Sequence, residues 1–234
     1  MRLDEIEGKT YTESDLDSLI SYIRRNCRSW LLKSGGEPVY RGIKYAGHDI
    51  AFTKPIRANR EPRDSTPVKH LIFNEMLKRL GNVNRENSAF VNRDSGIASG
   101  YGHPFVFMPI GEFEYAWSPE FQDWTTDFNL HTVVKTTSEL YGMDIINVNK
   151  ALTQRFKETG VWKDEGFRRP EARQLAKEIV DEEIDMSRLA SVIKVNEGLD
   201  RALRARHEIM IKADAGMYVR QSPYLRIRDQ LILQ

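Results

Sequence analysis

Two stretches near the start of the chain place apolar residues at three- and four-residue spacing, the pattern of one buried helix face. The first follows Ser14 and ends at the glycine pair 35–36, which predicts a helix over about residues 13–33. The second starts at Thr66, carries apolar positions from 68 to 80 and stops at Gly81. Threonine before a helix and glycine after it are common boundary residues, so we predict a second helix there.

The middle of the chain changes to short apolar runs separated by Gly, Pro, Asp and Ser, which is typical of strands. We predict strands at about 38–43, 89–91, 104–108 and 113–117. Residues 131–204 are expected to be mostly helical, with the strongest pattern at 171–184. The runs 208–211 and 217–220, separated by Asp-Ala-Gly, predict a hairpin that returns to the sheet.

The sequence contains no repeat, low-complexity tract or composition break that would require a domain boundary. We therefore expect a single domain over residues 1–234, of the α+β class, with about six mostly antiparallel strands. The helix at 13–33 precedes the strands, and the segment 131–204 is a helical insertion between them.

Charge and composition exclude several classes of protein. The 234 residues include 35 Lys and Arg and 34 Asp and Glu, a formal net charge of +1, so the chain has no overall attraction to nucleic acid or to an anionic membrane. No apolar run reaches the roughly 18–20 residues of a membrane span, and the first residues lack the apolar core of a signal peptide. Cys27 is the only cysteine, so no internal disulfide can form. We expect a cytoplasmic protein without a membrane partner.

Familiar catalytic and ligand-binding motifs are absent from the sequence. It has no P-loop, no HExxH, no paired CxxC and no GxSxG. The glycines around Tyr101 do not make a dinucleotide fingerprint, because the third glycine is missing and the segment precedes a strand. The five histidines show no ligand spacing, so no bound metal is expected.

Three polar residues, each at or beside a predicted strand, are more informative. Arg41 is followed by Gly42, so an arginine that can bind phosphate stands beside a residue that leaves room for a flat ring. The alternative for Arg41 is a surface ion pair at an edge strand. Ser88 opens a strand and can hydrogen-bond another side chain, although serines also occur at strand starts without a function. Glu208 opens a late strand and can stabilise developing positive charge, or it can pair with one of the arginines just before it.

The order and flanks of these residues resemble the R-S-E class of ADP-ribosyltransferases. That family has a Tyr-Arg-Gly strand, a second-strand serine followed by an Ala-x-x-Tyr helix, and a late glutamate that opens an apolar strand. The matching segments are Tyr40-Arg41-Gly42, Ser88-Ala89-Phe90 with Ala98-Ser99-Gly100-Tyr101, and Glu208-Ile209-Met210-Ile211 with Gly216-Met217-Tyr218-Val219. The resemblance covers about residues 37–220 and implies a split, mostly antiparallel sheet with an NAD cleft.

The resemblance also implies a role for each residue. Arg41 would bind an NAD phosphate, the Gly42 backbone would hydrogen-bond the nicotinamide amide, and Tyr101 would stack on the ring. Ser88 would position Glu208, whose carboxylate would bind the nicotinamide ribose and stabilise an oxocarbenium-like transition state. The expected catalytic residues are therefore Arg41, Ser88 and Glu208, and the expected NAD-binding residues are Arg41, Gly42, Ser88 and Tyr101. NAD is the substrate, and no metal is needed.

Two departures from the family pattern bear on the acceptor. The family often has Ser-Thr-Ser where this chain has Ser-Ala-Phe at 88–90, so only the first serine is carried over. Arg206 stands two residues before Glu208, where enzymes that modify arginine, and several that modify guanine, have Gln or Glu, which argues against an arginine acceptor. Arg204, Arg206 and His207 are the expected acceptor-binding residues. This positive cluster favours RNA or DNA slightly over protein, although basic helix faces are often solvated or paired with nearby acidic residues.

Glu112 and Glu114 form a Glu-x-Glu pair that superficially resembles the bi-glutamate motif of arginine-modifying transferases. The pair comes too early in the chain for the family glutamate. Strand alternation instead assigns Phe113 and Tyr115 to the core and both carboxylates to solvent. Glu114 is the next choice if Glu208 proves dispensable.

The resulting expectation is a mono-ADP-ribosyltransferase that acts on a macromolecule inside a bacterial cell, as a toxin, a phage-defence effector or a phage-encoded host modifier. An antitoxin protein is a candidate partner. Segments 60–64 and 107–119 are also similar to uncharacterised phage and bacterial proteins, but this similarity does not indicate an activity. The alternatives are a protein-modifying transferase, an NAD glycohydrolase in which water replaces the acceptor, and a non-catalytic phage binding or structural protein.

Overall fold

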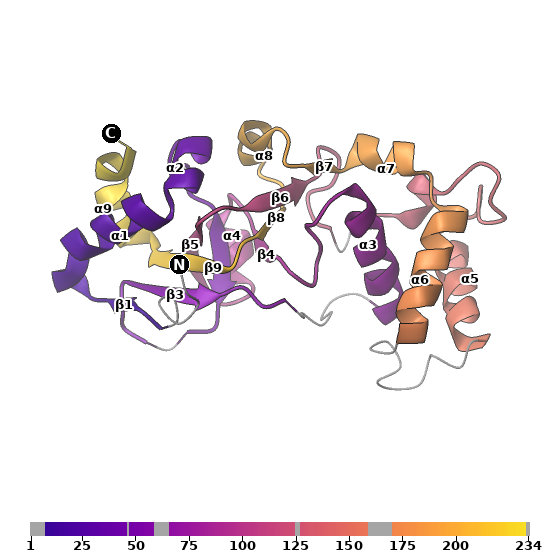
Figure 1. Cartoon of the computed structure of the whole chain (residues 1–234), viewed down its shortest axis with the longest axis horizontal. Helices are drawn as coiled ribbons and strands as arrows, with labels where there is room; N and C mark the ends of the chain where they lie inside the picture. The colour runs from indigo at the N-terminus through magenta and orange to yellow at the C-terminus, as the bar shows by residue number, and fades with distance from the viewer. Residues whose placement is uncertain (1–7, 46, 59–65, 125–126, 159–169, 233–234) are drawn as a thin grey trace.

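The computed structural model describes residues 8–45, 47–58, 66–124, 127–158 and 170–232, which form an α+β structure with two antiparallel sheets (Figure 1). The first sheet has the strand order β1-β3-β9-β5-β2, and the second has the order β4-β8-β6-β7. The strands are β1 (Thr10–Tyr11), β2 (Tyr40–Ile43), β3 (Ala51–Pro55), β4 (Ala89–Val91), β5 (His103–Ile110), β6 (Glu114–Trp117), β7 (Lys194–Val195), β8 (Ile209–Lys212) and β9 (Ala215–Arg220).

Helices gather at both ends of the molecule, with the second sheet between them (Figure 1). The helices α1, α2 and α9 lie at the end formed by the first sheet, whereas α3, α5, α6 and α7 lie at the other end. The helices are α1 (Leu16–Asn26), α2 (Arg28–Ser34), α3 (Pro67–Leu80), α4 (Ser95–Ser99), α5 (Ile145–Glu158), α6 (Pro170–Glu183), α7 (Met186–Val192), α8 (Leu199–Ala205) and α9 (Gln221–Ile232), with short 3-10 turns at Glu13–Asp15 and Leu130–Val133. Within the described residues, no helix combines the length and apolar character needed to cross a membrane.

The two predicted N-terminal helices have different outcomes. The helix that begins at Pro67 is confirmed: the Thr66 hydroxyl accepts the N–H of Lys69 (3.4 Å), and Gly81 follows the last turn. The single helix expected over 13–33 is instead two helices, α1 and α2, which break at Cys27. The backbone of Cys27 leaves helical geometry there, and its side chain is fully buried in the core between the two helices.

The predicted hairpin over 208–220 is wrong, because β8 and β9 belong to different sheets. β8 pairs with β4 and β6, whereas β9 pairs with β3 and β5. The chain therefore crosses from one sheet to the other within two residues, and each strand becomes central in its own sheet. The sequence did not predict β1, β3 and β7, so the described residues contain nine strands where about six were predicted. The helix α9 was not predicted either.

The helical insertion expected at 131–204 is present in the described part of that segment. It holds α5, α6, α7 and α8, and the short strand β7 interrupts it by pairing with β6. The helix predicted at 171–184 corresponds to α6. Residues 159–169 and the segment 60–64 lie outside the described residues.

Two hydrophobic clusters cover opposite faces of the second sheet. Ala89, Ile209 and Ile211 belong to the cluster that also contains the first sheet and the helices α1, α2, α8 and α9. Ala116 and Met210 belong to the cluster formed with α3, α5, α6 and α7. Because successive side chains alternate in a strand, the side chain two residues before Met210 is turned toward the second cluster.

Candidate functional site

The edge of the first sheet is formed by β2, which carries Arg41 and Gly42. The N–H of Phe107 in β5 donates to the carbonyl of Val39 (2.8 Å), and backbone bonding alternates along an antiparallel pair. Arg41 therefore faces β5 with its backbone groups, whereas Gly42 turns its N–H and C=O away from β5. Gly42 thus presents one donor and one acceptor at the sheet edge.

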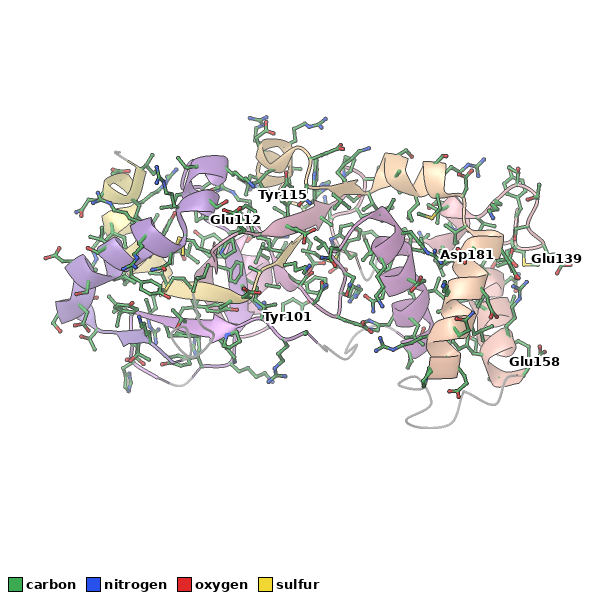
Figure 2. The ribbon with its side chains drawn as sticks, viewed as in Figure 1. Tyr101, Glu112, Tyr115, Glu139, Glu158 and Asp181 are labelled. Atoms are coloured by element: carbon green, nitrogen blue, oxygen red, sulfur yellow. The ribbon has the colours of Figure 1, made fainter. Side chains whose placement is uncertain are left out.

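The short helix α4 packs against this edge and requires glycine there. A Cβ on Gly42 would lie 2.0 Å from the carbonyl oxygen of Ala98 and 2.8 Å from the Cβ of Tyr101. Gly102 makes a second close approach, with φ +139° and a virtual Cβ 2.6 Å from the carbonyl carbon of Ile43. Tyr101 is 57% exposed, so an accessible ring stands beside the polar edge of Gly42 (Figure 2).

The guanidinium of Arg41 includes a buried nitrogen. Its Nη1 is shielded from solvent and has no hydrogen-bond partner among the residues that the structure describes. In the strand register, Arg41 lies directly across from Phe105 of β5, which is buried. A buried donor without an acceptor costs about 1–3 kcal/mol, and phosphate oxygens match the guanidinium geometry. Arg41 is therefore a candidate anion-binding residue.

Glu208 directly precedes β8 and is held by the segment 122–124. Its N–H donates to the carbonyl of Gln122 (2.9 Å), and its Oε2 accepts the backbone N–H of Trp124 (3.4 Å). The indole of Trp124 also donates to the Glu208 carbonyl (3.2 Å). The carboxylate is thereby directed to the side of the sheet that faces α3, and it remains partly exposed.

Asn92 lies between the strands that carry Arg41 and Glu208. Its backbone exchanges two hydrogen bonds with Tyr40 (2.6 and 3.0 Å), and the pairing of Val91 with Ile209 continues to a position opposite Glu208. The backbones of Tyr40 and Glu208 are therefore two strand spacings apart, about 10 Å. Asn92 is buried, and its Oδ1 accepts the N–H of Asp94 (2.8 Å).

The structure does not bring Ser88 to Glu208. Ser88 is four residues before Asn92, about 13 Å along the strand, and the register sets it at the Lys212 end of β8. It is fully buried, with its Oγ 3.0 Å from Oδ1 of Asn87. Sequence reasoning missed Asn92 because the start of β4 was taken as the functional position.

The expected acceptor-binding residues at the end of α8 are mostly engaged locally. Arg204 forms an exposed ion pair with Asp200 one turn earlier. Arg206 is exposed and ends the helix with φ +59°. Nδ1 of His207 is 2.8 Å from the carbonyl oxygen of Ser118. Arg204 and Arg206 are therefore both exposed, and Arg204 already pairs with Asp200.

The Glu-x-Glu pair at 112–114 has structural partners. Glu114 forms an ion pair with Lys212 (3.0 Å), and Glu112 is exposed and accepts from Ser29 (3.2 Å). Phe113 and Tyr115 are buried, as strand alternation predicted. The pair therefore behaves as the outward side of a strand.

A separate surface hollow lies between α3 and α6, remote from Arg41. Its charged groups satisfy one another, because Arg79 pairs with Asp181 (2.8 Å) and Lys135 donates to the Asp181 carbonyl (2.5 Å). Over the described ranges, no three His, Cys, Asp or Glu residues are grouped so as to hold a metal ion. The edge of β2 and the Glu208 position remain the stronger candidate site.

Comparisons of the chain with protein-family models, with curated protein sequences and with solved structures give no match.

Proposed function

We propose that the protein is an NAD-dependent mono-ADP-ribosyltransferase with the split sheet of that family. The observation that carries the proposal is the edge of β2, where Gly42 turns its N–H and C=O away from β5, next to Arg41 and beside the exposed Tyr101. The guanidinium of Arg41 matches the geometry of a phosphate group. The order of the two sheets and the resemblance of the flanking segments support the same reading.

The edge of β2 matches the chemistry of nicotinamide. A carboxamide has one acceptor oxygen and one donor nitrogen, and Gly42 offers an N–H and a C=O that point away from β5. The exposed ring of Tyr101 covers the flat heterocycle from the side of α4. Arg41 binds a phosphate of the same substrate.

The reaction breaks the bond between C1′ of the nicotinamide ribose and the ring nitrogen, and the bonding electrons leave with nicotinamide. Positive charge develops on the ribose, and the Glu208 carboxylate stabilises it while accepting hydrogen bonds from the ribose hydroxyls. The acceptor nucleophile then bonds to C1′ and loses its proton. Asn92, opposite Glu208, positions that carboxylate.

We place this activity in a bacterial cell, as a toxin, a phage-defence effector or a phage-encoded host modifier. Expression of the active enzyme then arrests growth, and Arg41→Ala or Glu208→Ala relieves the arrest. An antitoxin protein would protect the producing cell.

The test is incubation of the purified protein with NAD labelled on the adenylate phosphate, against separate pools of protein, RNA, and single- and double-stranded DNA. Glu208→Gln keeps the shape of the side chain and removes its charge, and Glu114→Gln is the matched control. We expect one labelled pool with the unsubstituted protein and the control, and none with Glu208→Gln. NAD consumption without a labelled pool would indicate a glycohydrolase, and unconsumed NAD would leave a non-catalytic binding protein.

A further inference from the structure

The two halves of the candidate site belong to different sheets. Arg41 and Gly42 lie in β2 of the first sheet, whereas Glu208 directly precedes β8 of the second. The two sheets meet where Tyr40 of β2 and Asn92, the residue after β4, exchange two backbone hydrogen bonds (2.6 and 3.0 Å). This bridge therefore sets the spacing between the edge of β2 and the residue that lies opposite Glu208.

Arg93 follows the bridge in the chain and reaches back across it to the other strand. Its Nη1 donates to the carbonyl of Pro38 (3.1 Å), two residues before Tyr40, and the same nitrogen pairs with the carboxylate of Glu37. The side chain of Arg93 is 25% exposed, so water screens these contacts less than those of a fully exposed pair. Arg93 therefore fastens the segment after β4 to the segment before β2, beside the backbone bridge.

The sequence neighbours of Arg93 connect it to both parts of the site. Asn92 lies opposite Glu208 in the strand register. Asp94 caps α4, the helix that packs against Gly42, and its N–H donates to Oδ1 of Asn92 (2.8 Å). A shift of this segment would therefore move the residue opposite Glu208 relative to β2.

The carboxylate of Glu37 has a second partner, which supplies a matched control. Arg228 of α9 donates to it through Nη2 (2.7 Å), and the side chain of Arg228 is 32% exposed, close to the value for Arg93. Arg228 belongs to the helix that follows β9 and not to the second sheet. Loss of Arg228 therefore removes an ion pair from the same carboxylate without releasing the segment after β4.

We propose that Arg93 is a positioning residue of the transferase, which holds the bridge between the two sheets at the spacing that the reaction requires. A substrate bound at Arg41 and Gly42 must present C1′ of its ribose to the Glu208 carboxylate, and a misplacement of about 1 Å can reduce a rate about 100-fold. Arg93 acts through the backbone bridge and not by contact with NAD. This inference rests on the proposed transferase function, because it concerns the geometry of that reaction.

The experiment compares Arg93→Gln with Arg228→Gln, since each removes one cation from the same carboxylate. Nicotinamide release is measured in steady state to give kcat and KM for NAD. We expect Arg93→Gln to reduce kcat about tenfold or more, because Glu208 is displaced from the ribose. KM should stay nearly unchanged, because Arg41 and Gly42 remain in place in the first sheet. Arg228→Gln should retain the kcat of the unsubstituted protein.

Hydrogen exchange at the backbone amides of Tyr40 and Asn92 reports on the bridge itself, without any substrate. These amides should exchange faster in Arg93→Gln than in the unsubstituted protein, and at an unchanged rate in Arg228→Gln. Arg93→Lys is the conservative variant, which also serves if Arg93→Gln fails to fold. It keeps a cationic donor for the same acceptors, so it should restore part of kcat and part of the protection.

An unchanged kcat in Arg93→Gln, or an equal loss in Arg228→Gln, would overturn the inference. A raised KM with kcat retained would also overturn it, because that pattern indicates lost substrate binding. If NAD is cleaved and the two amides exchange equally in all variants, the role of Arg93 is wrong and the proposed function stands. If the unsubstituted protein does not cleave NAD, the proposed function fails, and the positioning role of Arg93 in catalysis fails with it.

Discussion

Replacing Arg41 with methionine is expected to stabilise the ligand-free protein and to abolish its response to NAD. Methionine keeps an unbranched apolar stem and removes the buried Nη1 that lacks a partner among the described residues. An unsatisfied buried donor costs about 1–3 kcal/mol, so we expect a net gain of about 1 kcal/mol. In a chain of this size, that raises the melting temperature by about 2–4 °C.

The response to ligand has the opposite sign. NAD at about 100 times its dissociation constant stabilises a protein that binds it by about 2.7 kcal/mol, which raises the melting temperature by at least about 5 °C. Arg41→Met removes the phosphate contact, so its melting temperature should not respond to NAD at that concentration.

The assay is thermal unfolding followed by circular dichroism, with and without NAD. Arg25→Met is the control, because Arg25 is an exposed cation and its loss should change stability by no more than about 0.5 kcal/mol. The reasoning is refuted if Arg41→Met melts below the unsubstituted protein, or if NAD raises the melting temperature of both proteins equally.

Three further predictions test the surroundings of the site. Gly42→Ala should lower the free energy of unfolding by about 1–3 kcal/mol and stop NAD consumption, because its Cβ would lie 2.0 Å from a carbonyl oxygen of α4. Gly100→Ala is the control and should be tolerated, because the nearest contact of its Cβ is at 3.4 Å. A urea titration and an NAD-consumption assay measure both variants. Asn92→Ala should reduce NAD cleavage far more than Ser88→Ala in steady-state kinetics, and equal losses would contradict the strand register. Burial raises the pKa of Tyr224 to about 12, from 10.0 when unfolded, so its contribution to stability is complete below pH 10 and is lost as the pH rises through about 12. Tyr224→Phe should flatten alkaline denaturation over that range and cost about 1–3 kcal/mol at neutral pH, because its hydroxyl satisfies a buried carbonyl (2.6 Å). An unchanged alkaline transition would refute the assignment.

Local signals predicted several elements closely. The threonine-proline start and glycine stop of α3 are confirmed, and β4 matches its predicted range, because caps and short apolar runs act within a few residues. Cys27 gave no such signal, and the break between α1 and α2 there was missed. α9 was also missed, although it packs against β5 and β9.

In the candidate site, local patterns likewise identified some residues, whereas another was identified only by the strand register. Arg41, Gly42 and Glu208 stand in short sequence patterns that suggested binding chemistry, and the structure positions all three at strand edges or ends. Ser88 was chosen by the same kind of pattern, but the register puts Asn92 opposite Glu208. A register depends on long-range pairing, which a local pattern does not contain.

The sequence by itself determined the α+β class, most of the strands, and the residue types that can bind phosphate and stabilise positive charge. Only the tertiary structure decided that β8 and β9 enter different sheets and that the Glu208 carboxylate is turned toward Trp124 and the second hydrophobic cluster. The physical reason is that side-chain chemistry and helix caps are properties of neighbouring residues, whereas strand partners and faces are set by the packing of segments that are far apart in the sequence.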